Sequence, residues 1–161
     1  MSIVVNSTPL ISLALLDQLD LLKMIFGEVI VPCAVYDEVV TRGADKIGYK
    51  NLSAVQWFCI EEVINQALKQ SIMIELDEGE AEVICIAKEK SIKRVCIDEF
   101  AGRKYAKLLG LDVIGTLGIL LIAKEKNYIQ KIKPCIDKLI ANNRHIGASV
   151  YNEVLRKAGE L

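Results

Sequence analysis

The sequence is poor in the residues that thiol and imidazole chemistry need. It holds a single histidine, His145, and its five cysteines form no CxxC pair and stand among apolar neighbours. We therefore expect reduced thiols in the core of a protein from a reducing compartment, with neither a disulfide framework nor a zinc site. Because His145 has no Cys or His companion and no GxSxG segment is present, a Ser/His/Asp triad is not expected either.

The chain also lacks long apolar runs and glycine-rich phosphate loops, and its net charge is close to zero. Hydrophobic residues make up 52% of the chain, but the runs LISLALL and LGILLIA are much shorter than a membrane span of roughly 20 residues. No secretory signal is recognisable, so we expect a cytoplasmic protein that contacts no membrane. The segment GLDVIGTLG has Thr116 where a P-loop needs lysine, and no GxGxxG is present. The net charge of −1 indicates nothing about nucleic acid.

Short β-branched runs alternate with helical patterns along the chain. Apolar runs of this length are typical of buried parallel strands, and we expect them at 2–5, 28–31, 94–97 and 112–114, with 57–60 as a fifth candidate. We expect helices capped by Ser7 or Thr8, from Asp17 or Asp20 to Gly27, from Pro32 to Gly43, and at 65–74, 79–90, 100–109, 116–127, 134–142 and 149–158. The segment 43–53 is expected to be a polar loop. This alternation predicts one domain, 1–161, with a three-layer α/β/α sandwich around a parallel sheet of four or five strands.

Acidic residues follow the expected strands, at the edge where parallel sheets bind ligands. Glu38 lies among valines, and Asp98 and Glu99 follow the run 94–97. Glu80 belongs to the helical stripe 80, 83, 84 and 87, which is otherwise apolar, and a carboxylate there is costly unless it is paired or bound to a cation. Taken singly, each acid is explained by the dipole of the helix that it begins. Together, carboxylates at one edge favour Mg²⁺ or Mn²⁺.

Three segments carry a resemblance to a known family. They are VVNSTPLISLALLDQLDLLKMIFGEVIVPCAVYDEVV, LDEGEAEVICIAKE and CIDEFAGRKYAKLLGLDVIGTLGILLIAKEKNYI, which together span about residues 3–130. Their order resembles the PIN-domain family, the nucleases that include the VapC toxins, and more closely a PIN-like branch known as a domain of unknown function. The resemblance implies acidic residues at the sheet edge, a Mg²⁺ or Mn²⁺ site and cleavage of RNA. Residues 131–161 remain as a C-terminal helical extension.

The resemblance also implies which residues form the site. The four acidic positions of the family fall on Asn6, Glu38, Glu80 and Asp98, which are the candidate catalytic residues. Glu38, Glu80, Asp98 and Glu99 are the candidate metal ligands. Ser7 or Thr8 corresponds to the family's hydroxyl residue beside the first acid, and Thr116 follows the last strand next to the site.

Asn6 is the departure from the family pattern. An amide oxygen still binds a hard cation, but the site loses one negative charge that a hydrolytic metal needs. We therefore expect one weakly held ion and slow or conditional ribonuclease activity. The alternative is a catalytically inactive PIN-like module that binds RNA or protein.

Possible partners follow from charge, composition and the resemblance. Arg103, Lys104 and Lys107 lie on the helix directly after the acidic edge and are candidate contacts to RNA phosphates. The high apolar content of a chain without a membrane segment predicts a homodimer. The resemblance to toxins adds a small antitoxin-type protein as a further expected partner, with this chain as the toxin of the pair.

Overall fold

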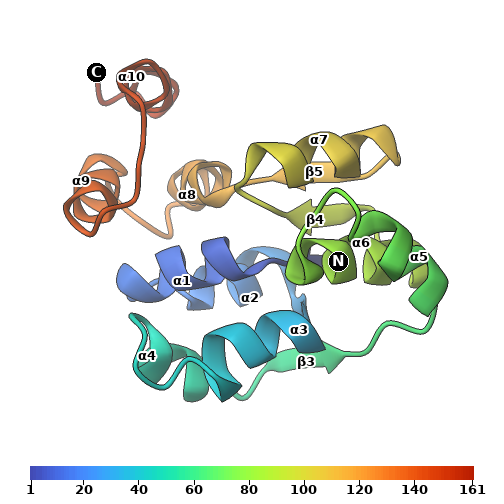
Figure 1. The fold of residues 1–161 in the computed structure, drawn as a ribbon. Coiled ribbons are helices and arrows are strands. Elements are labelled where there is room, and N and C mark those ends of the chain that lie inside the picture. The colour runs from blue at the N-terminus through green and yellow to red at the C-terminus, as the bar shows by residue number, and fades with distance from the viewer.

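The computed structural model describes all 161 residues and contains one five-stranded sheet (Figure 1). β1 (Ser2–Val5) lies in the middle, with β2 (Glu28–Pro32) and then β3 (Phe58–Glu61) on one side, and β4 (Arg94–Cys96) and then β5 (Asp112–Ile114) on the other. All neighbours are parallel, and Val4 pairs with both Ile30 and Val95. The predicted strands, including the fifth candidate, are confirmed to within one residue at each end.

Ten α-helices and one π-helical turn connect and cover the strands. They are α1 (Ser7–Leu15), α2 (Asp20–Phe26), α3 (Cys33–Tyr36), η1 (Asp37–Thr41, the π-helical turn), α4 (Tyr49–Ser53), α5 (Gln66–Ile72), α6 (Glu78–Glu89), α7 (Phe100–Leu108), α8 (Thr116–Glu125), α9 (Lys133–Ala141) and α10 (Ala148–Lys157). No helix combines the length and the apolar character that crossing a bilayer requires.

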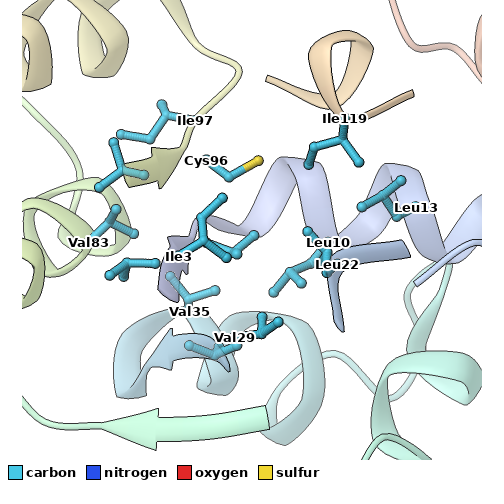
Figure 2. Packing of buried hydrophobic residues seen from close by; sticks show 14 of the residues in the cluster. Ile3, Leu10, Leu13, Leu22, Val29, Val35, Val83, Cys96, Ile97 and Ile119 are labelled. Atoms are coloured by element: carbon cyan, nitrogen blue, oxygen red, sulfur yellow. The ribbon is translucent and has the colours of Figure 1, made fainter. Parts of the chain in front are cut away.

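The helices lie on both faces of the sheet, so the three-layer α/β/α prediction is confirmed. α6 packs across β1, β2 and β4, with α3 and α5 against it, whereas α2 packs on β2 and contacts α8. Figure 2 shows the core between these layers, with Val83 of α6 on one side of the strands and Leu10 and Ile119 on the other. In Figure 1, α9 and α10 lie beyond α8, at the periphery of the molecule.

Two local expectations were wrong, and a third was right only in part. Neither Ser7 nor Thr8 caps α1, because Asn6 takes the N-cap position with extended backbone. The segment 43–53 is not wholly a loop, since α4 forms inside it and buries Leu52. The helix that follows Pro32 ends by Gly43 as expected but is not regular throughout: it changes at Asp37 into a π-helical turn, in which the amide of Arg42 reaches back five residues to the carbonyl of Asp37.

The cysteines are all free thiols, as predicted. Only Cys85 and Cys96 lie in the core; the other three are half-buried. Burial raises the pKa of the Cys85 thiol to about 11 and that of the Cys96 thiol well above its usual value. Both buried thiols are therefore protonated and unreactive at neutral pH.

The strand order places a crevice at the carboxyl ends of β1 and β4. The chain leaves β1 toward β2 and leaves β4 toward β5, and such a reversal is where open parallel sheets bind ligands. The two strand ends are joined directly, because the backbone amide of Asn6 donates to the carbonyl of Cys96 at 3.0 Å. The residues after these two strands form the site described next.

Candidate functional site

Asn6 stands where β1 ends and α1 begins, and its side chain is buried but uncommitted. Although Asn6 is the N-cap residue of α1, its side chain makes no capping hydrogen bond, and its amide donates to none of the neighbouring carboxylates. Its Oδ1 lies 3.3 Å from the position that a Cβ on Gly79 would occupy, at the start of α6. Asn6 therefore faces the N-terminus of α6 without holding the site's carboxylates together.

Glu80 occupies the first turn of α6 and is buried there, as the apolar stripe predicted. Its backbone amide donates to Asp77 Oδ1 at 2.8 Å and the amide of Asp77 donates back to Glu80 Oε2 at 3.2 Å, which forms a capping box. The carboxylate has no ion-pair partner. Burial raises the pKa of Glu80, and the charges of Asp77 and Glu99 raise it further. The capping box accounts for one oxygen of Glu80, and Oε1 stays free.

Gly102 is the reason that α7 can pass close to this carboxylate. A Cβ at Gly102 would lie 3.1 Å from Glu80 Oε1 and 3.0 Å from Ile97 Cγ2, so a larger residue there would require these side chains to shift by a few tenths of an ångström. This glycine was not recognised from the sequence, because a single glycine inside a helical pattern gives no sign of what it faces.

Asp98 follows β4 and is bound at both oxygens by the start of α8. The amide of Thr116 donates to Oδ1 at 2.8 Å, and its hydroxyl donates to Oδ2 at 2.7 Å. Burial raises the pKa of Asp98 above its ordinary value, although the Thr116 hydrogen bonds and Arg103 act in the opposite direction. The placement of Thr116 beside the site agrees with the expectation from the sequence.

Arg103 turns inward, whereas Lys104 and Lys107 on the same helix are exposed. Its Nη1 donates to the carbonyl of Ile97 at 2.8 Å. The same atom lies 2.9 Å, and Asp98 Oδ1 2.8 Å, from the position of a Cβ on Gly115. Of the three cationic candidates, Arg103 thus forms a hydrogen bond inside the site, and the two lysines are exposed to solvent.

Glu99 and Thr8 join α7 to α1 at the rim of the site. Glu99 is exposed and accepts a short hydrogen bond from the Thr8 hydroxyl. The neighbouring Ser7 hydroxyl is buried and has no hydrogen-bond partner. Since Glu99 acts on the pKa of both Glu80 and Asp98, these three carboxylates form one electrostatic unit.

Glu38 is not brought into this unit by any contact. It lies half-buried in η1, and its side chain forms no hydrogen bond or ion pair. The expected grouping of Glu38 with Glu80 and Asp98 around a metal is absent, because no three Asp, Glu, His or Cys side chains are placed to hold an ion. Asp98 is held instead by the start of α8, and Glu80 by the start of α6.

A cavity of about 310 Å³ opens beside Asp98 and Thr116. Its far wall consists of Asn143–Ile146, the connection between α9 and α10, and includes Arg144 and the exposed His145. These residues could not be placed here from the sequence, because they lie far along the chain from the candidate acidic positions and in no recognisable motif. The C-terminal extension therefore borders the site.

One family model, described as a PIN domain, matches residues 2–160. The chain belongs to the PIN-domain family. No curated protein and no solved structure matches it. The match extends through α9 and α10, so both the acidic edge and the far wall of the cavity lie within the matched part of this PIN domain. A PIN domain has a nuclease-type fold, which agrees with a site at the carboxyl edge of the sheet.

The side chains of this PIN domain fit a hard cation in their donor chemistry. Glu80, Asp98, Glu99 and the amide oxygen of Asn6 offer only oxygen, the donor that Mg²⁺ and Mn²⁺ prefer. Mg²⁺ commonly binds through one or two carboxylates and completes its shell with water and substrate phosphates. Glu80 Oε1, which accepts no hydrogen bond, is an oxygen that such an ion could use, although no group of three ligands is present.

Proposed function

We propose that this PIN domain is a ribonuclease that depends on Mg²⁺ or Mn²⁺ and acts at the carboxyl ends of β1 and β4. The observation that supports the proposal is Glu80, a buried carboxylate with a raised pKa and no cationic partner. Asp98, whose pKa is also raised, follows β4, the strand adjacent to β1. Unpaired buried carboxylates destabilise a fold, and a cluster of perturbed acids in a crevice is typical of functional sites.

In this proposal the side chains of the site have different roles. Glu80, Asp98 and Glu99 would hold the cation, with Asn6 Oδ1 as a neutral oxygen and Glu38 as a further acid at the border of the site. A bound divalent cation supplies positive charge beside the phosphate under attack. Thr116 orients Asp98 through two hydrogen bonds, Arg103 adds positive charge nearby, and the exposed Lys104 and Lys107 attract the RNA backbone.

The direct test is cleavage of labelled single-stranded RNA in Mn²⁺, Mg²⁺ and chelator. Glu80→Gln keeps an acceptor for the Asp77 amide while it removes the charge, so we expect correct folding and a loss of activity of at least about a hundredfold. Glu125→Gln is the matched control, because Glu125 is exposed and unpaired on α8. Equal activity of Glu80→Gln and the control would contradict the proposal.

A second candidate is a PIN-like module that binds RNA or protein without cutting. The amide at Asn6 and the lack of a three-carboxylate group favour it. Two results together would establish this alternative. The protein would bind RNA without cleaving it in either metal, and Mn²⁺ would leave its melting temperature unchanged.

We further propose that the protein forms a homodimer and that it pairs with a small antitoxin-type protein as the toxin of the two. Exposed apolar side chains support an association surface, among them Ile64, Ile74 and Phe100 at 86%, 84% and 80% exposure. Light scattering after gel filtration measures the oligomeric state, and a strictly monomeric protein would contradict the dimer. Growth arrest on expression, relieved by a co-expressed neighbouring small protein, is the expected sign of a toxin.

A further inference from the structure

The cavity beside Asp98 has walls of opposite charge. The inner wall carries Asp98, Thr116 and the hydroxyls of Thr8 and Ser12, and the outer wall carries Arg144 and His145. Its volume of about 310 Å³ lies at the small end of the range for ligand sites, roughly 300–1,000 Å³. Hydrophobic residues are the minority of its lining, and the lining includes both an acidic and a basic side chain, so it can accept a charged group.

Arg144 is held in place by the end of α9. Asn143 adopts a left-handed conformation with φ of 65° and donates its amide to the Ile140 carbonyl at 3.1 Å, while the Arg144 amide donates to the Leu139 carbonyl at 3.0 Å. These two bonds form a Schellman motif, which fixes the direction in which the chain leaves the helix. Arg144 therefore has an ordered backbone, not that of a free loop.

Arg144 is half-buried and forms no ion pair, although it lines the same cavity as Asp98. Asp98 already accepts hydrogen bonds from Thr116 at both oxygens and has the positive charge of Arg103 nearby, so its charge is compensated without Arg144. A cationic fork that faces an open cavity next to a carboxylate edge has the donor geometry for a phosphate, which guanidinium groups bind with two parallel hydrogen bonds.

We propose that Arg144, with His145 beside it, binds a backbone phosphate of single-stranded RNA, so that the C-terminal extension completes the substrate site. This inference rests on the proposed function, since it assigns one contact of the same substrate. The RNA strand then runs from Asp98, which follows β4, across the cavity to the end of α9. The hydroxyls of Thr8 and Ser12 line its path.

The test measures binding, separately from cleavage. Fluorescence anisotropy of a labelled oligouridylate in chelator, over a series of salt concentrations, gives both the affinity and its salt dependence. We expect Arg144→Ala to weaken binding roughly tenfold and to make the slope of log K against log salt shallower by about 0.7, the value for one phosphate contact on a single strand. A merely structural role would leave that slope unchanged.

Matched variants complete the design. Arg156→Ala removes an exposed, unpaired arginine from α10 and should bind like the wild type. Arg144→Lys should keep the salt slope but lose part of the affinity, because lysine lacks the fork. If Arg144→Ala does not fold, Arg144→Gln takes its place in both measurements.

Several results would overturn the proposal. They are no binding by the wild type, equal binding by Arg144→Ala and Arg156→Ala, and inorganic phosphate that binds as tightly as the oligonucleotide. RNA cleavage that persists unchanged in Arg144→Ala would remove this contact and leave the nuclease proposal intact. Binding that depends on Arg144 in a protein that cuts no RNA would support this contact and contradict the nuclease proposal.

Discussion

Replacement of Asn6 by aspartate restores the charge that the family pattern has at this position, and its cost can be worked from the structure. Asn6 Oδ1 and Asp77 Oδ1 lie 3.3 Å and 3.6 Å from the same point, the Cβ position of Gly79, so they are at most about 7 Å apart. Two negative charges at that distance repel by about 2 kcal/mol at an effective dielectric constant of about 20. An N-cap aspartate regains about 0.3–1 kcal/mol from the dipole of α1.

The net expectation in chelator is a loss of about 1–2 kcal/mol. The change is nearly isosteric and removes no hydrogen bond, because the Asn6 side chain makes none, so electrostatics alone sets the result. For a chain of this size the melting temperature should fall by about 2–6 °C. A cation that binds only the folded state offsets this loss, by about 2.7 kcal/mol at a concentration a hundred times its dissociation constant.

Thermal denaturation of wild type and Asn6→Asp in chelator and in Mn²⁺ is therefore the assay, with RNA cleavage measured on the same samples. We expect Asn6→Asp to be less stable in chelator, to be rescued by Mn²⁺ and to cut RNA faster. Asn152→Asp, at an exposed position on α10, makes the same chemical change away from the site and should respond to neither condition. An Asn6→Asp protein that ignores Mn²⁺ would refute the reasoning.

Three further variants test individual interactions. Glu80→Gln should be more stable than wild type at neutral pH, by about 1.4 kcal/mol per unit of pKa shift, because the folded state holds the proton of Glu80 more tightly than the unfolded state. The advantage should vanish as the pH falls below about 4, where glutamate becomes neutral in both states. Lys69→Met should lose about 3–5 kcal/mol in urea denaturation, because it leaves the buried Glu82 carboxylate, 2.6 Å from Lys69 Nζ, without its partner; Glu82→Gln in the same chain should recover most of the loss. Thr116→Val should cost about 1–2 kcal/mol at neutral pH and raise the pKa of Asp98 further, because it removes one of the donors to that carboxylate; a pH–stability profile identical to wild type would contradict this.

The sheet was predictable because each strand is a short apolar run, and burial on both faces leaves that pattern in the sequence. Glu80 was predictable for the same reason, since one acid interrupts an otherwise buried stripe. Glu82 was not, although it is equally buried, because its partner Lys69 comes from another helix and its second partner is the amide of Ala34. Pairing between distant segments leaves no local signal.

The geometry of the candidate site was harder to predict than its membership. Position in the chain placed Asp98 and Thr116 together, but the inward turn of Arg103 depends on the carbonyl of Ile97 and on the lack of a side chain at Gly115. Glu38 lies in η1, and nothing in the residues 37–41 distinguishes a π-helical turn from a regular helix. Arg144 came to the site through the packing of α9 and α10, which no motif describes.

The central place of β1 determines the order in which the molecule can assemble during synthesis. Its pairing with β2 joins Val4 to Ile30, so half of the sheet can form early, whereas its pairing with β4 joins Val4 to Val95. Contacts between residues so far apart in the chain form late, and a growing chain folds from its N-terminus. A nascent chain that ends before β4 has no Asp98, no Thr116 and no cavity. On the proposed function, this order keeps the RNA-cleaving site unformed until β4 and β5 have been translated.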